Sequence, residues 1–405
     1  MTETRAGTFV AFRSRDFRLL WGGQTISFVG DAAFVVALGW RVTDLTGKAS
    51  SLGFVLALES LAMLMTLLWA GVLADRHSRR LMMIGSDLVR AVVVAVFCAL
   101  EATGHVSLTA ILVLAAIFGL ADGFFQPAFG GIVPLVVEQP TLPSANSWIG
   151  VARNGSAIVG PAIAAALYHT AGPAVVWGID AGSFVASALA LWFARPRSLA
   201  PRESSGFRRE LAEGFRYVVS VPWIWTGIAA ATVILMVAMA PFTALLPRVV
   251  QVHYHRGVGS YGLLFSAMAA GMVAGSLAWA KWHPRRRRVI VCFAAFGIND
   301  LGIVVVAVTS WYPLAVLAVA WRGLFIGIGI AAWLTLMSEL VPEHLLSRAM
   351  SIDFFGSIGL TPVGFVLAGA LATVVPPTTI LAVGGLLGAL LWFAPLTWGR
   401  VRNAA

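Results

Sequence analysis

The feature that most constrains this sequence is its set of long apolar segments. Twelve segments, separated by short polar connections, occupy residues 17–42, 50–74, 82–102, 108–136, 146–168, 173–194, 222–247, 258–280, 288–309, 313–341, 346–372 and 376–396. A helix that crosses a bilayer needs about 20 apolar residues. Because the backbone in lipid must satisfy its own hydrogen bonds, each segment is expected to be helical. The sequence therefore predicts an all-α membrane protein with twelve transmembrane helices.

Composition excludes a soluble protein. Of the 405 residues 59% are hydrophobic and 11% are charged, whereas a soluble domain carries about 25% charged residues. The two cysteines, Cys98 and Cys292, lie inside apolar segments and predict no disulfide framework. A soluble enzyme and a disordered chain are both incompatible with these values.

The positions of the 28 basic residues predict the orientation of the chain. With the N-terminus inside the cell, 21 of them fall on the cytoplasmic side, four on the outside and three within spans. This asymmetry is the positive-inside pattern, so both termini are expected in the cytoplasm. The net charge of +10 is therefore interpreted as a topology signal with contacts to anionic membrane lipids, and no nucleic-acid partner is expected.

The longest polar stretch divides the spans into six and six. We expect an N-terminal six-helix bundle over 1–194, a cytoplasmic linker with an interfacial helix over 195–221, and a C-terminal bundle over 222–405. A shift of 201 positions places Glu138 on Glu339, Gly155 on Gly356 and Pro161 on Pro362. This weak internal repeat favours two pseudo-symmetric bundles.

The segment between the second and third spans carries the most specific motif. It contains Gly71, Asp75, Arg76, Arg79 and Arg80 at fixed spacing. Glycine permits close helix approach, and an aspartate at the rim can interact with the positive N-terminus of a neighbouring helix. The alternative is an ordinary basic turn. The spacing resembles motif A of the major facilitator superfamily, and this resemblance implies the two-bundle fold and a gating role for these five residues.

Within that superfamily, the chain resembles the twelve-span bacterial exporters of macrolides, multiple drugs and enterobactin. The residues that carry the resemblance are Phe28 to Asp31, Ser86 to Arg90, Gly160-Pro161 and Asp180 to Phe184. It implies a monomer in the bacterial inner membrane that exports hydrophobic or amphiphilic small molecules by proton antiport and alternating access. The antiporter motif of the fifth span retains Gly155, Gly160 and Pro161, but alanines replace its closing glycines, which weakens the inference of proton antiport.

Two alternatives to drug export remain at this point. One is a dedicated lipid or siderophore exporter, and the other is a membrane-embedded enzyme, for which no paired catalytic residues are evident. No cofactor is expected, because the Gly257 to Gly262 segment matches a dinucleotide fingerprint without a preceding strand. No metal site is expected either, because His253 and His255 lack a third ligand nearby.

Carboxylates inside spans are the candidates for proton coupling. Ionisable groups in the membrane are costly and are functional suspects, and all seven histidines fall in loops or at helix ends. The resemblance places the first and fourth spans around a central cavity, so Asp31 and Asp122 rank first and Glu59 next. A structural hydrogen bond is the alternative for each.

The remaining polar and aromatic residues give weaker expectations. Asp300 and Arg322 lie at equal depth in adjacent antiparallel spans and predict a structural ion pair. Asp87 and Arg90, three residues apart, predict another. The candidates for the substrate cavity, for which packing is the alternative, are Phe34, Phe124, Phe125, Gln126, Asn154, Phe354 and Phe355.

Overall fold

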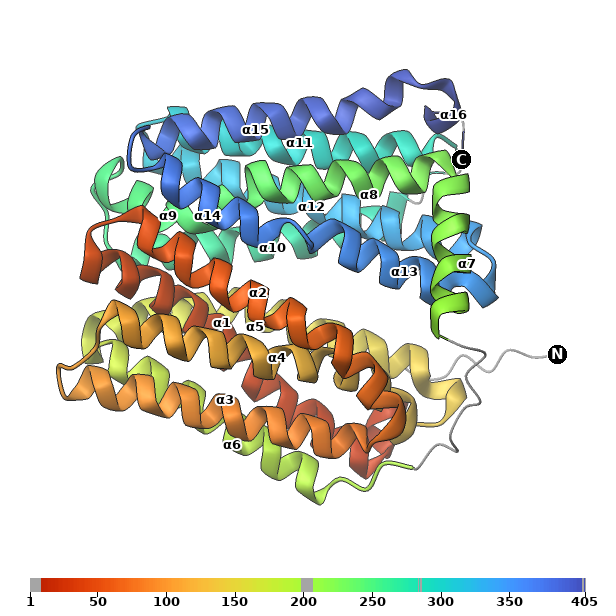
Figure 1. Cartoon of the computed structure of the whole chain (residues 1–405), viewed down its shortest axis with the longest axis horizontal. Coiled ribbons are helices and arrows are strands. Elements are labelled where there is room, and N and C mark those ends of the chain that lie inside the picture. The colour runs from red at the N-terminus through yellow and green to blue at the C-terminus, as the bar shows by residue number, and fades with distance from the viewer. Residues whose placement is uncertain (1–8, 198–206, 283, 285, 403, 405) are drawn as a thin grey trace. The chain divides into compact units, whose positions relative to one another are not determined.

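The computed structural model describes residues 9–197, 207–282, 284, 286–402 and 404, and Figure 1 shows its helices. The first half contains α1 (Arg15–Thr46), α2 (Ala49–Arg76), α3 (Arg79–Ala102), α4 (Leu108–Val136), α5 (Leu142–Ala171) and α6 (Pro173–Phe193), with short 3-10 turns at Val10–Arg13 and Gln139–Thr141. The second contains α7 (Phe207–Ser220), α8 (Pro222–Ile234), the π-turn η3 (Leu235–Met239), α9 (Ala240–Val252), α10 (Val258–Trp282), α11 (Arg288–Val308), α12 (Tyr312–Leu340), α13 (Glu343–Ile358), α14 (Thr361–Leu371), α15 (Pro377–Phe393), the 3-10 turn Ala394–Thr397 and α16 (Gly399–Arg402).

Each of the twelve predicted spans coincides with one helix or with consecutive helices. Eleven stretches of the described chain are long and apolar enough to cross a membrane. The predicted span outside this set is α5, in which Asn146, Ser147, Arg153 and Asn154 lower the hydropathy. The all-helical membrane fold predicted from the sequence is therefore confirmed.

The chain divides into two compact units. One comprises Met1–Thr46 and Leu58–Arg202, and the other comprises Gly47–Ala57 and Glu203–Ala405. The first turns of α2 thus belong to the C-terminal unit, where Ala57 packs with Ala240, Ala244 and Phe365. In the same unit the amphipathic α7 packs on α8 and α13 and runs crosswise to them (Figure 1).

The two units pair their helices in the same way. In the N-terminal unit α1 packs on α5 and α6, and α3 packs on α4 and α6. In the C-terminal unit the segment α8–η3–α9 packs on α13, α14 and α15, and α11 packs on α12 and α15. The first, third, fourth, fifth and sixth spans of each unit therefore have equivalent partners, as an internal repeat requires.

Glycines allow the second and fourth spans of each unit to touch backbone to backbone. A Cβ on Gly119 of α4 would lie 2.1 Å from the carbonyl oxygen of Glu59 on α2. A Cβ on Gly323 of α12 would lie 2.0 Å from the carbonyl oxygen of Met268 on α10. Gly123 and Gly327 repeat the contact one turn later. Only glycine permits such an approach, and small residues are the usual means of packing helices in membranes.

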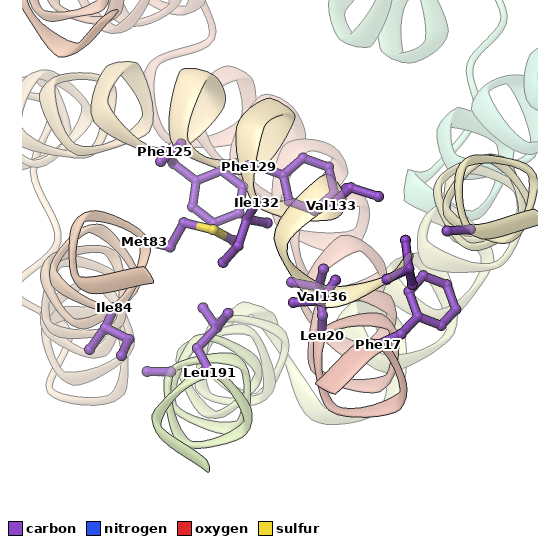
Figure 2. Close-up of a cluster of buried hydrophobic side chains, with 14 of the residues drawn as sticks. Phe17, Leu20, Met83, Ile84, Phe125, Phe129, Ile132, Val133, Val136 and Leu191 are labelled. Carbon is purple, nitrogen blue, oxygen red and sulfur yellow. The ribbon is translucent and has the colours of Figure 1, made fainter. Parts of the chain in front are cut away.

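Apolar side chains from α1, α3, α4, α5 and α6, and from the 3-10 turn before α1, fill one end of the N-terminal unit. Phe17 and Leu20 of α1, Met83 of α3, Phe129 of α4 and Leu191 of α6 belong to this cluster. Figure 2 shows side chains of this cluster, among which Met83 of α3 points toward Ile132 of α4. The cluster gives the unit a packed end and leaves its polar residues farther along the same helices.

Candidate functional site

A chain of polar side chains crosses the interior of the N-terminal unit and centres on Arg90 of α3. Arg90 Nη2 donates to Asp87 Oδ1 at 2.5 Å, one helical turn earlier. Ser187 Oγ of α6 donates to Asp87 Oδ2 at 2.7 Å, and Gln24 Nε2 of α1 donates to Ser187 Oγ at 2.7 Å. The predicted Asp87–Arg90 pair is confirmed, and neutral side chains of two further helices extend its hydrogen bonds, while Arg90 Nε has no hydrogen-bond partner among the described residues.

The guanidinium of Arg90 also reaches α4. Its Nη1 lies 3.5 Å from Asp122 Oδ1, and its Cζ lies 4.2 Å and 4.4 Å from the ring centres of Phe125 and Phe184. The Arg90 residue is 2% exposed. A charge this deep requires compensation, and here two carboxylates and two aromatic faces supply it.

The three predicted coupling carboxylates share this neighbourhood. Asp31 of α1 interacts electrostatically with Arg90, Asp122 and Asp87. Glu59 of α2 interacts with Asp122 and Asp31. Asp31, Glu59 and Asp122 are each half-buried, whereas Asp87 is fully buried. The structure therefore gathers the three candidates from separate helices into one acidic cluster, with Arg90 as the cation common to Asp31 and Asp122.

Asp180 of α6 extends the cluster and was not ranked among its members by sequence reasoning. Its Oδ1 accepts from Ser183 Oγ at 3.2 Å, and its buried Oδ2 has no hydrogen-bond partner among the described residues. A Cβ on Gly30 would lie 2.3 Å from Asp180 Oδ1. Because Gly30 has no side chain, the Asp180 carboxylate fits against α1 next to Asp31.

Two of the cavity candidates pack in the core instead. Phe34 is 3% exposed and stacks on Phe118 at 5.2 Å. Phe125, also 3% exposed, lies under Arg90 and stacks on Phe129. Both rings are therefore buried in this structure, because residue type and span do not fix which face of a helix a ring occupies. The candidates that remain at least partly accessible are Phe124, Gln126, Asn154, Phe354 and Phe355.

Two further charged residues inside predicted spans, Arg153 and Asp353, have side-chain partners in the structure. Arg153 of α5 is exposed, and its Cζ lies 5.3 Å and 5.6 Å from the ring centres of Phe28 and Phe129. Asp353 of α13 accepts from Trp333 Nε1 at 2.8 Å and from Ser357 Oγ at 3.2 Å. Arg153 therefore presents an accessible cation between aromatic rings of α1 and α4.

The predicted ion pair between Asp300 and Arg322 requires correction. Both residues are buried and attract one another electrostatically. Asp300 Oδ1 nevertheless accepts from Asn299 Nδ2, and the Arg322 guanidinium lies 4.0 Å from the ring centre of Phe242. Within the described chain, Asp300 Oδ2 and Arg322 Nε and Nη1 have no hydrogen-bond partner. The two residues lie at the same depth, but they form no direct ion pair, and Arg322 Nη2 contacts Met239 Sδ at 3.9 Å instead.

The basic pair of the motif after α2 binds the ends of other helices. Arg79 Nη1 donates to the carbonyl of Gly131 on α4 at 2.6 Å. Arg80 Nε donates to the carbonyl of Leu191 at 2.8 Å, and Arg80 Nη2 donates to that of Trp192, both in the last turn of α6. Both cations thus bind carbonyls near helix C-termini. The side chains of Gly71, Asp75 and Arg76 lie outside the described part of the structure.

The fifth-span motif has a packing role at two of its three positions. A Cβ on Gly160 would lie 2.5 Å from Ala32 Cβ on α1, so this glycine brings α5 against α1 beside Asp31. Pro161 is buried within α5, and Gly155 has nothing within 4 Å of a Cβ.

The family model of the Major Facilitator Superfamily matches residues 20–359. The chain belongs to this superfamily. Macrolide efflux protein A of Streptococcus pyogenes is 24% identical over 363 residues, with 88% of this chain and 89% of that protein covered. The multidrug efflux pump Tap of Mycolicibacterium fortuitum is 28% identical over 387 residues, covering 92% and 91%. The enterobactin exporter EntS of Citrobacter koseri is 26% identical over 376 residues, covering 91% and 88%.

A solved structure shows the same fold. The inward-facing structure of a bacterial homologue of the iron transporter ferroportin matches with a TM-score of 0.73 and 15% identity, over 95% of this chain and 99% of that one. The resemblance to efflux members of the superfamily, inferred from residues such as Asp31, Asp87 and Gly160-Pro161, is therefore confirmed. The protein is a multi-pass membrane transporter with efflux relatives.

Proposed function

We propose that the protein exports hydrophobic or amphiphilic small molecules from bacterial cells by proton antiport and alternating access. The acidic cluster around Arg90 carries the proposal. Asp31, Glu59 and Asp122 come from three helices, interact electrostatically and remain partly accessible. Intramembrane carboxylates in this arrangement are typical of proton relays.

Protonation of a carboxylate in the cluster changes the net charge around Arg90. When Asp31 or Asp122 binds a proton, Arg90 loses one of its compensating carboxylates while Asp87 remains bound to it. The net charge about the guanidinium therefore rises by one. A change of this size in a low-dielectric interior shifts the balance between states that expose the cluster to opposite sides.

The positive-inside pattern supports a placement in the bacterial inner membrane with both termini in the cytoplasm. We propose that the protein works as a monomer, since each unit contains its own buried core. Lipids of the surrounding bilayer are then its remaining partners.

Transport in liposomes tests the proposal. The purified full-length protein is reconstituted with an acidic lumen, and uptake of radiolabelled erythromycin or of ethidium is followed with and without nigericin. Accumulation against a gradient that collapses with nigericin is expected. Uptake that is unchanged when the pH gradient is removed would contradict antiport while leaving facilitated transport intact.

A second candidate, a dedicated siderophore exporter, is favoured by Arg153. An accessible guanidinium between the Phe28 and Phe129 rings suits an anionic aromatic ligand, and one group of relatives is named for enterobactin export. Competition of iron-free enterobactin against erythromycin uptake, in the wild type and in Arg153→Gln, separates the two. Selective loss of enterobactin competition in the variant supports the siderophore role.

A further inference from the structure

A cavity of about 660 Å³ opens in the C-terminal unit at the end remote from α7. Its walls are residues 47–50 before and within the start of α2, the last turn of α9 with His253, and the connection from α14 to α15 over residues 372–378. All of these segments belong to one compact unit. The volume is in the range of small-molecule binding sites, and the acidic cluster lies in the other unit.

The charge of this cavity is unusual for its position. Lys48, Arg248 and His253 line it, and no aspartate or glutamate does. Only four of the 28 basic residues are expected on the outer side of the membrane, and two of those four are Lys48 and Arg248. Half of the basic residues expected on the outer side thus line this one cavity, and their positive charge would attract an anion.

Hydrogen bonds hold the end of α9, which carries His253, in position. His253 Nε2 lies 2.7 Å from the carbonyl oxygen of Thr309, and the ring packs edge-on against Tyr254 at 4.9 Å. Tyr254 in turn donates to the carbonyl of Val306 at 2.5 Å. With Nε2 engaged by this carbonyl, Nδ1 is the ring nitrogen of His253 that is left for a further contact. The end of α9 is thus fixed to the end of α11, and the site is preformed.

Two further features of the cavity, its helix N-termini and its apolar walls, suit an amphiphile with an anionic headgroup. The first turns of α2 and α15, including Ser50 and Thr378, contribute the positive ends of two long helices. Between the cations, the walls are apolar, with Val249, Val252, Ala372 and Pro376. Cations beside apolar walls at the end of a membrane bundle are the chemistry that anionic lipid headgroups recognise.

We propose that this cavity binds the anionic headgroup, phosphate or carboxylate, of an amphiphile at the outer end of the C-terminal unit. Arg248 and Lys48 supply the charge, His253 supplies a fixed ring nitrogen, and the valines contact the first carbons of the chain. The site is independent of the acidic cluster and of proton coupling.

Binding to the purified full-length protein in neutral detergent tests the site. The probes are dihexanoyl phosphatidylglycerol, dihexanoyl phosphatidylcholine and inorganic phosphate, with affinity measured from the shift in thermal unfolding. Phosphatidylglycerol is expected to bind, and Arg248→Gln to weaken it about tenfold or more, the loss of one charged hydrogen bond. Exposed Lys48→Gln provides a second variant that leaves the packing unchanged.

Arg256→Gln is the matched control, because Arg256 lies nearby over the Tyr312 ring and does not line the cavity. Tighter binding of phosphatidylglycerol than of phosphate identifies a lipid or amphiphile source, and equal binding identifies a soluble anion. Equal binding of phosphatidylglycerol and phosphatidylcholine, or equal effects of the Arg248, Lys48 and Arg256 variants, would overturn the proposal.

Discussion

Arg90 is the residue on which the charged interior of the N-terminal unit depends. Its removal would leave Asp87 fully buried without a cation. Breaking a buried pair from one side costs about 3–5 kcal/mol. We therefore expect Arg90→Gln to lower the thermal unfolding midpoint markedly in detergent, and Asp87→Asn added to it to restore part of the loss. An additive double variant would show that the pair is not coupled.

Asp31 is predicted to carry the coupling proton. Asp31→Asn should abolish gradient-driven accumulation in liposomes, while downhill exchange of the same compound continues, because asparagine keeps the size of the side chain but cannot release a proton. Asp44→Asn, at the exposed end of the same helix, is the control and should behave as wild type. Uphill transport by Asp31→Asn would transfer the role to Asp122 or Glu59.

Helical spacing predicted some of these contacts and not others. Asp87 and Arg90 are one turn apart on the same helix, so their pairing follows from the sequence. The contact of Arg90 with Asp122, and the Gln24–Ser187 bond, depend on how separate helices are rotated. The same holds for Asp300 and Arg322. Their equal depth in the membrane follows from the sequence, but the rotation of each helix about its axis does not. Neutral residues such as Gln24 gave no charge signal that could have marked them.

The glycine contacts bring the backbones of paired helices into direct contact. The α10–α12 pair is the clearest case, because Gly271 and Gly275 of α10 also face carbonyls of α12. Such contacts cannot be inferred from apolar segments alone, although the spacing of Gly323 and Gly327 is a recognised packing signal. The positions of the spans, in contrast, were predictable because bilayer thickness sets their length.

Replacing one of these glycines tests the packing. Gly323→Ala places a methyl group 2.0 Å from the Met268 carbonyl, and backbone cannot move aside as a side chain does. Overpacking typically costs about 1–3 kcal/mol, so a lower unfolding midpoint and a lower yield of monodisperse protein are expected. Gly259→Ala on α10 has free space and should be neutral or slightly stabilising. Equal behaviour of the two variants would refute the close contact.

Arg80 provides a second test at this scale. Its bonds to the last turn of α6 link the start of α3 to that helix. Loss of a cation at a helix C-terminus costs about 0.3–2 kcal/mol, so Arg80→Gln should reduce thermal stability modestly. Arg400→Gln, which lies in the terminal α16, serves as the control for a lost basic residue. If Arg80→Gln unfolds at the same temperature as the wild type, the bonds of Arg80 to α6 contribute nothing to stability, and the residue acts only as a topology signal.

For the whole molecule, the distribution of basic residues makes a prediction about sidedness. In a background without Cys98 and Cys292, a cysteine at Ser220 should resist a membrane-impermeant maleimide in intact cells and react after lysis. A cysteine at Val374, which is 79% exposed between α14 and α15, should react in intact cells. The reverse pattern would invert the proposed topology and place the basic cavity in the cytoplasm.

The glycine contacts also bear on how such a chain can diverge. Where a neighbouring carbonyl already occupies the place of a Cβ, as at Gly119 and Gly323, any larger residue must displace backbone and lowers stability. Surface positions such as Leu317 and Leu390, which are 63% and 60% exposed, can accept other apolar residues without loss. A few backbone contacts thus restrict a few positions and leave most of the sequence free to change, which fits relatives of only 24–28% identity.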